Sequence, residues 1–122
     1  MSTIHEKYLE VLKRDLIYGN NKLRSLHYFR STNISVIIWF IILEYTFKKK
    51  PLNLEKIIDE VRKLTRVSKP TISKILEDGI IRGLIIKYKS DTDKRLTLYS
   101  PTELTVKEFK KWSEDLFNLK NN

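Results

Sequence analysis

The length, composition and charge of the chain set its broad class. It has 122 residues, 41% of them hydrophobic, which suffices for one compact domain with a buried core and excludes wholesale disorder. The formal net charge of +9 and the pI near 9.7 indicate a polyanionic partner, although abundant lysine, isoleucine and asparagine are also typical of compositional bias. Because cysteine is absent, disulfides, thiolate metal sites and thiol-based redox sensing are excluded.

Membrane and targeting signals are not evident in the sequence. The N-terminus lacks the basic and then apolar layout of a secretory signal. The longest unbroken apolar run, residues 36–43, is far shorter than the roughly 20 residues that a membrane helix needs. We therefore expect a soluble cytoplasmic protein with no membrane association.

The first expected element is an amphipathic helix near the N-terminus. Thr3 and Glu6 have the spacing of a capping box. Apolar side chains then recur on one face: Ile4, Tyr8, Leu9, Val11, Leu12 and Leu16. Gly19-Asn20-Asn21 ends the pattern, and the apolar face can pack either on its own domain or on a second subunit. Residues 22–30 give no clear pattern, and Thr32 or Asn33 can cap the element that follows.

The most hydrophobic stretch, residues 35–47, is predicted to be a helix buried on most sides. Its β-branched content also suits a buried strand, but its length and the lack of Gly and Pro favour a helix. We expect Trp39 and Phe40 to be core aromatics rather than parts of a cofactor site. Three lysines, residues 48–50, then suit the dipole at the helix C-terminus, with phosphate contact as an alternative.

Two further helices joined by a short turn are expected next. Pro51 and Asn53 mark the start of the first helix. Its apolar face is formed by Leu54, Ile57, Ile58, Val61 and Leu64. Ser68 is the expected N-cap of the second helix, and Gly83 ends it. The second apolar face, at helical spacing, consists of Ile72, Ile75, Leu76, Gly79 and Ile80. Helices so closely connected cross steeply, which predicts a helix-turn-helix.

Two strands are predicted after this pair of helices. Residues 84–89 and 95–99 alternate in the manner of strands, and the polar residues 90–94 between them favour a turn. A hairpin directly after the second helix of a helix-turn-helix is a wing.

Three stretches of the segment from residue 54 to residue 100 form a recognisable set: Ser68-Lys69-Pro70-Thr71-Ile72-Ser73-Lys74-Ile75-Leu76-Glu77-Asp78, Arg82-Gly83-Leu84-Ile85 and Ser90-Asp91-Thr92-Asp93-Lys94-Arg95. With them, this segment resembles the winged-helix core of MarR-type transcriptional regulators. It implies that Arg95, in the Asp-x-Arg motif of the wing, enters a minor groove while Asp93 holds the wing in shape. The sequence departs from the family at Gly79, where a large apolar residue is usual, and at Ile80 and Ile81, where charge is common. An interior Gly costs about 1 kcal/mol relative to Ala, so we expect the second helix to be locally weakened.

A last amphipathic helix is expected after Pro101-Thr102. Its apolar stripe consists of Val106, Phe109, Trp112, Leu116 and Leu119. A stripe beyond a complete core needs a partner, and the resemblance implies dimerisation through helices from both termini. The predicted fold is therefore mainly α (α+β), one winged helix-turn-helix domain over residues 1–122. It has a two-stranded wing, a DNA-binding core at 32–100 and dimerisation helices at 1–30 and 102–120.

No catalytic or metal-binding motif stands out. The sequence lacks a Gly-rich phosphate loop, a nucleophile elbow and a His–Glu–His metal motif, and His5 and His27 have no partner at ligand spacing. We expect neither enzyme activity nor a metal or cofactor.

The leading hypothesis is a homodimeric, sequence-specific regulator that binds double-stranded DNA. The second helix would enter the major groove and the wing would contact the flanking minor groove or backbone. Candidate DNA-binding residues lie beside the turn, on the exposed helix face and on the wing: Arg66, Ser68, Lys69, Pro70, Thr71, Ser73, Lys74, Lys87, Lys89, Asp93, Lys94 and Arg95. A two-fold dimer predicts half-sites about one helical turn, 10–10.5 bp, apart.

Other functions remain as alternatives. A protein-interaction module would use an apolar patch at Ile80 and Ile81 and bind nucleic acid only weakly. RNA or replication-origin binding would use the same fold. The Asp93-x-Arg95 motif favours DNA, because a docking domain has no need of it. A small-molecule effector pocket lined by Tyr18, His27, Tyr28, Trp39 and Trp112 is a further hypothesis, although aromatics at such places are more often core.

Overall fold

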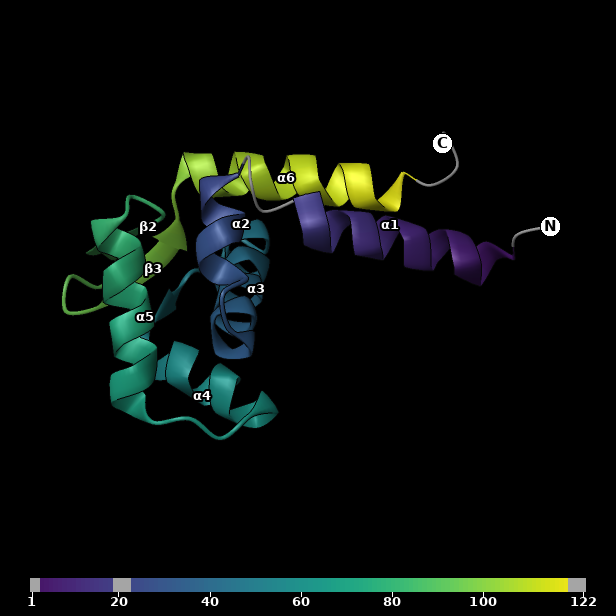
Figure 1. Cartoon of the computed structure of the whole chain (residues 1–122). Helices are drawn as coiled ribbons and strands as arrows, with labels where there is room; N and C mark the ends of the chain where they lie inside the picture. The colour runs from purple at the N-terminus through teal and green to yellow at the C-terminus, as the bar shows by residue number, and fades with distance from the viewer. Residues whose placement is uncertain (1–2, 19–22, 119–122) are drawn as a thin grey trace.

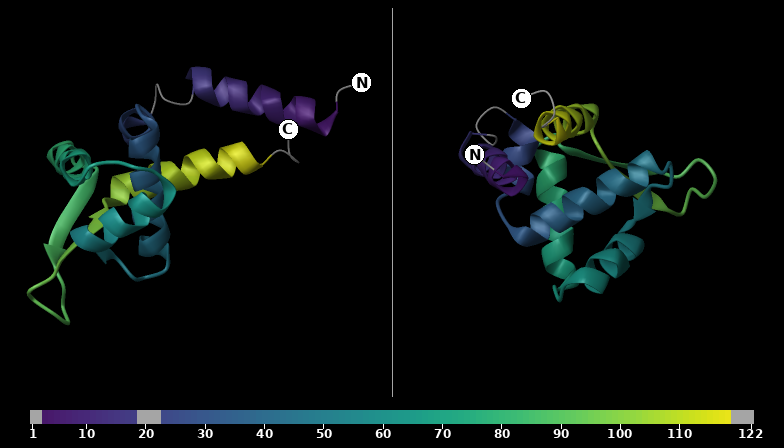
Figure 2. Two further views of the ribbon diagram at one scale, coloured as in Figure 1. Left: turned by 90° about the horizontal axis from the view of Figure 1, so that it is seen from below. Right: turned by 90° about the vertical axis from the view of Figure 1, so that its right-hand side faces the viewer.

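The computed structural model describes residues 3–18 and 23–118, which form helices and one small sheet (Figure 1). In chain order these elements are α1 (Ile4–Tyr18), α2 (Arg24–Phe29), α3 (Asn33–Phe47), β1 (Leu52–Asn53), α4 (Leu54–Leu64), α5 (Lys69–Ile81), β2 (Ile85–Lys89), β3 (Thr97–Pro101) and α6 (Glu103–Phe117). The N-terminal end of α1 lies on the opposite side of the molecule from α5 and the β2–β3 hairpin (Figures 1 and 2). The mainly helical winged helix-turn-helix fold predicted from the sequence is confirmed.

Helix starts follow the local sequence signals closely. The capping box at α1 forms, since Glu6 N donates to Thr3 Oγ1 at 3.1 Å and Thr3 N donates to Glu6 Oε2 at 3.3 Å. The side chains of Thr32, Asn53 and Ser68 accept hydrogen bonds from backbone amides at the starts of α3, α4 and α5. The cap of α6 by Thr102 was not anticipated. The predicted end of the first helix at Gly19-Asn20-Asn21 lies outside the described residues. Residues 22–30, which show no clear pattern in the sequence, contain α2.

The sheet has one strand more than the sequence predicted. Its order is β1-β3-β2, and both pairs are antiparallel. β1 pairs Leu52 with Tyr99, but it is two residues long, too short to produce a period in the sequence. The second predicted strand, 95–99, is wrong by two residues, because the wing turn includes Arg95 and the pairing extends to Pro101 opposite Ile85. Gly83, with φ of 74°, separates α5 from β2, as predicted.

The core lies between α2, α3, α4, α5 and the sheet, and α6 closes one side of it. Trp39 is fully buried, as predicted, and its ring contacts those of Phe29, Phe109 and Trp112. The prediction that Phe40 is a core residue is wrong: its ring stacks on Trp39, but 45% of the residue is exposed. Leu64 is also exposed, because it is the last residue of α4 and lies beyond the stripe that contacts the core. Leu119, the last position of the predicted C-terminal stripe, lies outside the described residues.

Gly79 is a packing position rather than only a weak point of α5. The residue is buried, and a Cβ atom placed on it would lie 2.6 Å from Ile85 Cδ1 and 3.0 Å from Ile85 Cγ1. Ile85 is itself buried in β2, so it has little room to move. The absence of a side chain at Gly79 therefore lets β2 approach α5 closely.

We expect Gly79→Ala to lower the free energy of unfolding by about 1 kcal/mol. Alanine in a helix interior normally gains about 1 kcal/mol over glycine, but overpacking costs about 1–3 kcal/mol. Urea unfolding of the variant measures the net effect. Combining it with Ile85→Val, which removes the contacting Cδ1 atom, should destabilise less than the sum of the two single changes. A gain of a full 1 kcal/mol in Gly79→Ala alone would contradict the close contact.

Candidate nucleic-acid interface

The second helix of the helix-turn-helix, α5, presents one face to the core and the other to solvent. Ile72, Leu76 and Gly79 are buried. The predicted candidates Lys69, Pro70, Thr71 and Lys74 are exposed, whereas the candidate Ser73 is half-buried. Glu77 and Ile81 are also exposed on α5. The predicted candidates in the first half of α5 are therefore exposed, and Glu77, which the sequence suggested to be a solvated charge, lies on the same exposed face.

The turn before α5 is held by its own side chains. Ser68 Oγ accepts from Thr71 N at 3.3 Å and lies 2.9 Å from Thr71 Oγ1, which assigns Ser68 to capping. Arg62 Nε donates to the carbonyl oxygen of Val67 at 3.3 Å. Arg66, in the same turn, is exposed. The turn thus keeps a fixed shape while it leaves a guanidinium available to a ligand.

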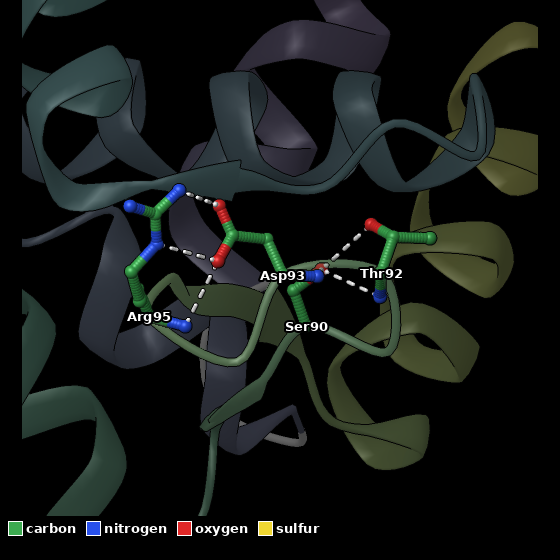
Figure 3. Close-up of polar contacts among 4 residues, drawn as sticks. All are labelled: Ser90, Thr92, Asp93 and Arg95. Carbon is green, nitrogen blue, oxygen red and sulfur yellow. Dashed lines mark hydrogen bonds and ion pairs between the residues drawn. The ribbon is translucent and has the colours of Figure 1, made fainter.

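The wing tip is organised by Ser90, Asp93 and Arg95 (Figure 3). The buried Ser90 Oγ accepts hydrogen bonds from the amides of Thr92 and Asp93, both at 3.3 Å. The Asp93 carboxylate accepts from the backbone N, Nε and Nη2 of Arg95, each at 3.1 Å. The predicted role of Asp93 in holding the wing is thus present in the geometry. The sequence placed Ser90 in the turn-forming loop between the two strands, but the hydrogen bonds that its Oγ atom accepts were not predicted.

The charge pair at the wing leaves the cation accessible. The Arg95 side chain is 90% exposed, whereas that of Asp93 is 33% exposed. Hydrogen bonds from the side chain and then the backbone of Arg95 lower the pKa of Asp93, and the Asp93 carboxylate raises the pKa of Arg95. Both groups therefore stay charged at neutral pH, with the guanidinium presented outward on a carboxylate support.

Two of the predicted lysines are also paired with carboxylates of the same chain. Lys87 Nζ lies 3.2 Å from Glu77 Oε1, and Lys69 Nζ lies 3.9 Å from Glu55 Oε2. Both pairs are exposed, so each contributes little to stability. Lys89 Nζ instead donates to Thr97 Oγ1 across the hairpin at 3.0 Å. Neither ion pair was anticipated, because each joins two different elements.

An open groove lies between the wing and the start of α4. It is lined by Asn53, Leu54, Glu55, Lys87, Tyr88, Lys89, Arg95, Leu96, Thr97 and Tyr99. The groove brings three of the predicted cations together, Lys87, Lys89 and Arg95. Lys94 is exposed in the adjoining turn. The basic residues of the wing therefore form one surface.

The aromatic residues considered for an effector pocket occupy different environments. Trp39 is buried in the core, and the partly buried Trp112 packs against it with ring centroids 5.5 Å apart. Tyr28 instead faces α5 and donates a hydrogen bond to the carbonyl oxygen of Ile75 at 2.7 Å. His27 is exposed, and the side chain of Tyr18 lies outside the described residues. Within residues 3–18 and 23–118, no group of three or more His, Asp or Glu residues could hold a metal ion.

A helix that crosses a membrane must be long and apolar. In the part of the chain that the structure describes, no helix combines the length and apolar character needed to cross a bilayer.

Comparison with known proteins identifies the fold through structure rather than sequence. No protein-family sequence model matches the chain, and no curated protein matches it by sequence. Among solved structures, it is similar to the S. aureus MepR–DNA complex, with a TM-score of 0.61, 18% identity and coverage of 94% of this chain and 86% of that one. It is also similar to MepR described as a transcription regulator of the Staphylococcus aureus multidrug efflux pump MepA (TM-score 0.57, 15% identity, 96% and 73% covered). NadR in complex with 4-hydroxyphenylacetate gives a TM-score of 0.58 at 15% identity, with 99% and 78% covered.

These similarities define the class of fold. The chain has the MarR-like winged-helix fold, in agreement with the resemblance of its sequence to MarR-type regulators. The similarity extends over nearly all of this chain, so it includes α1 and α6 as well as the winged-helix core.

Proposed function

We propose that this protein is a sequence-specific, double-stranded-DNA-binding transcriptional regulator that acts as a homodimer. The observation that carries the proposal is the juxtaposition of two basic surfaces, the exposed face of α5 and the wing, on a fold shared with a regulator solved on DNA. Recognition helices of this kind enter the major groove, and basic side chains beside them contact phosphates. The α5 face is assigned to the major groove, and the wing to the flanking minor groove or backbone.

The exposed apolar residues of α1 support the homodimer. Ile4, Leu9 and Leu12 are each more than half exposed, and Tyr8 is 41% exposed. Phe40 and Phe117 add exposed aromatic surface on α3 and α6. An exposed apolar stripe such as the one on α1 is typical of a protein–protein interface. A second copy of the chain is the proposed partner, and a two-fold dimer would bind two half-sites about 10–10.5 bp apart.

Selection from a random-sequence duplex library at two salt concentrations tests the proposal. An enriched site with two-fold symmetry is the expected result. Phosphate contacts alone would give retention that falls steeply with salt and enriches no sequence. That outcome would contradict sequence-specific regulation.

We expect Arg95→Ala to weaken specific DNA binding by about 1–3 kcal/mol and to leave the fold intact. The side chain is 90% exposed, so its loss removes a DNA contact without opening the core. Fluorescence anisotropy with the selected duplex measures the affinity, and thermal unfolding checks the fold. Lys111→Ala, which removes one positive charge from the exposed surface of α6, is the matched control. If the two variants bind equally well, the wing is not part of the interface.

A protein-interaction module is the second candidate function. Ile81 is 81% exposed and Ile80 is half-buried, so an apolar side chain does project from the end of α5. This function becomes the better explanation if the library selection enriches no site.

A further inference from the structure

The outward side of α5 is not uniformly basic. Pro70, Lys74, Glu77 and Ile81 are all exposed and follow one another at intervals of four, three and four residues. At 3.6 residues per turn these positions form one line along the helix, opposite the buried Ile72, Leu76 and Gly79. We call this line the outer stripe. Any DNA that receives α5 in its major groove faces the outer stripe, and a carboxylate lies near its middle.

We propose that Glu77 reads a cytosine in each half-site by accepting a hydrogen bond from the N4 amino group. This inference rests on the proposed function, because it requires α5 in the major groove. A carboxylate facing phosphates is repelled, so at this position it favours binding only where the groove offers a donor. In the major groove cytosine offers the N4 amino donor alone, whereas adenine places the N7 acceptor beside its donor. The second carboxylate oxygen is therefore repelled by adenine and tolerated by cytosine.

Lys87 makes a carboxylate at this position compatible with DNA. Its Nζ atom lies 3.2 Å from Glu77 Oε1 and offsets the negative charge close to the phosphates. The two side chains are 46% and 48% exposed, so a ligand can reach both. Because the ion pair is made through Oε1, we assign Oε2 to the base. Lys87 thus acts as a positioning residue that fixes the direction of the carboxylate.

Ile81 supports base reading rather than phosphate binding along the outer stripe. It lies one turn beyond Glu77 and is 81% exposed. An apolar side chain has no favourable contact with a phosphate, but it can contact the C5-methyl group of thymine in the major groove. Acceptor and apolar groups together are suited to base edges.

The test is a library selection with the parent, Glu77→Gln and Glu55→Gln. The parent should prefer C·G at one position of each half-site. Glutamine pairs with N6 and N7 of adenine, so Glu77→Gln should shift the preference at that position to A·T by about tenfold or more and leave the others unchanged. Glu55→Gln is the matched control, because Glu55 also pairs with a candidate DNA-binding lysine but belongs to α4. It removes the same charge and should change affinity without changing the preferred sequence.

The outcomes separate this inference from the proposed function. If Glu77→Gln binds more tightly but selects the parent's sequence, Glu77 only weakens binding electrostatically and the inference is wrong, while the regulator remains. If the parent itself enriches no site, the proposed function fails and the inference fails with it. Glu77→Ala is the second variant, because it removes the carboxylate without adding an amide that could itself bind a base. This variant should lose the base preference at that one position. An unchanged preference in Glu77→Ala would overturn the assignment as well.

Discussion

Trp39→Ala is expected to lower the free energy of unfolding by about 3–5 kcal/mol, the usual cost of removing a large buried aromatic side chain. Trp39 has no exposed surface and lies where α2, α3 and α6 meet. Its ring centroid lies 5.7 Å from that of Phe29, 5.6 Å from that of Phe109 and 5.5 Å from that of Trp112. Because domains are stable by only about 5–15 kcal/mol, this one change should remove a large share of the total.

Urea unfolding followed by circular dichroism measures the effect, and two variants sharpen it. Phe40→Ala, at the neighbouring 45% exposed position, removes another aromatic ring and should cost much less. Trp39→Phe should also cost less than Trp39→Ala. It keeps most of the ring, and it removes an indole N–H that is buried without an acceptor among the described residues. A loss below about 1 kcal/mol in Trp39→Ala would show that the site can collapse around the cavity.

The helical part of the fold could be predicted because its signals are local. Caps such as Thr3, Asn53 and Ser68 act within three residues, and apolar stripes repeat within one helix. β1 could not be predicted, since it exists only because β3, more than 40 residues later, pairs with it. Phe40 was assigned to the core for a related reason: in an all-apolar helix, periodicity does not show which side is uncovered.

In the candidate interface too, features within one helix could be predicted from the sequence and contacts between elements could not. Exposure of Lys69, Thr71 and Lys74 follows from the helix period, which the sequence displays. The ion pairs of Lys69 with Glu55 and of Lys87 with Glu77 depend on how α4, α5 and β2 are placed relative to one another. Sequence reasoning counted these lysines as free charges, whereas the structure shows a surface in which carboxylates are interspersed. The specificity proposed for Glu77 follows from that difference.

The second large effect is expected from a chain that lacks residues 103–122. α6 covers Trp39 of α3 with Phe109 and Trp112, and it also contacts α1, α2 and β3. The buried Glu108 Oε1 accepts from the backbone N and Oγ of Ser25 at 2.9 and 2.6 Å, and Thr105 Oγ1 donates to the carbonyl oxygen of Leu84 at 2.7 Å. Phe109 and Trp112 are partly buried against the core, where truncation of a fully buried aromatic costs about 3–5 kcal/mol. The loss of both rings together with these hydrogen bonds should therefore remove a large share of the about 5–15 kcal/mol that stabilises a domain. We therefore expect the shortened chain to be unfolded or aggregated.

Gel filtration and circular dichroism of the shortened chain provide the measurement, with Phe117→Ser in the full chain as the matched control. Phe117 belongs to the same helix but is 78% exposed, so its replacement should leave the core of each subunit folded. If α6 also takes part in the proposed dimer, Phe117→Ser should dissociate into folded monomers at a higher protein concentration than the parent. A soluble, stably folded monomer without residues 103–122 would contradict both the structural role of α6 and a dimer built from the terminal helices.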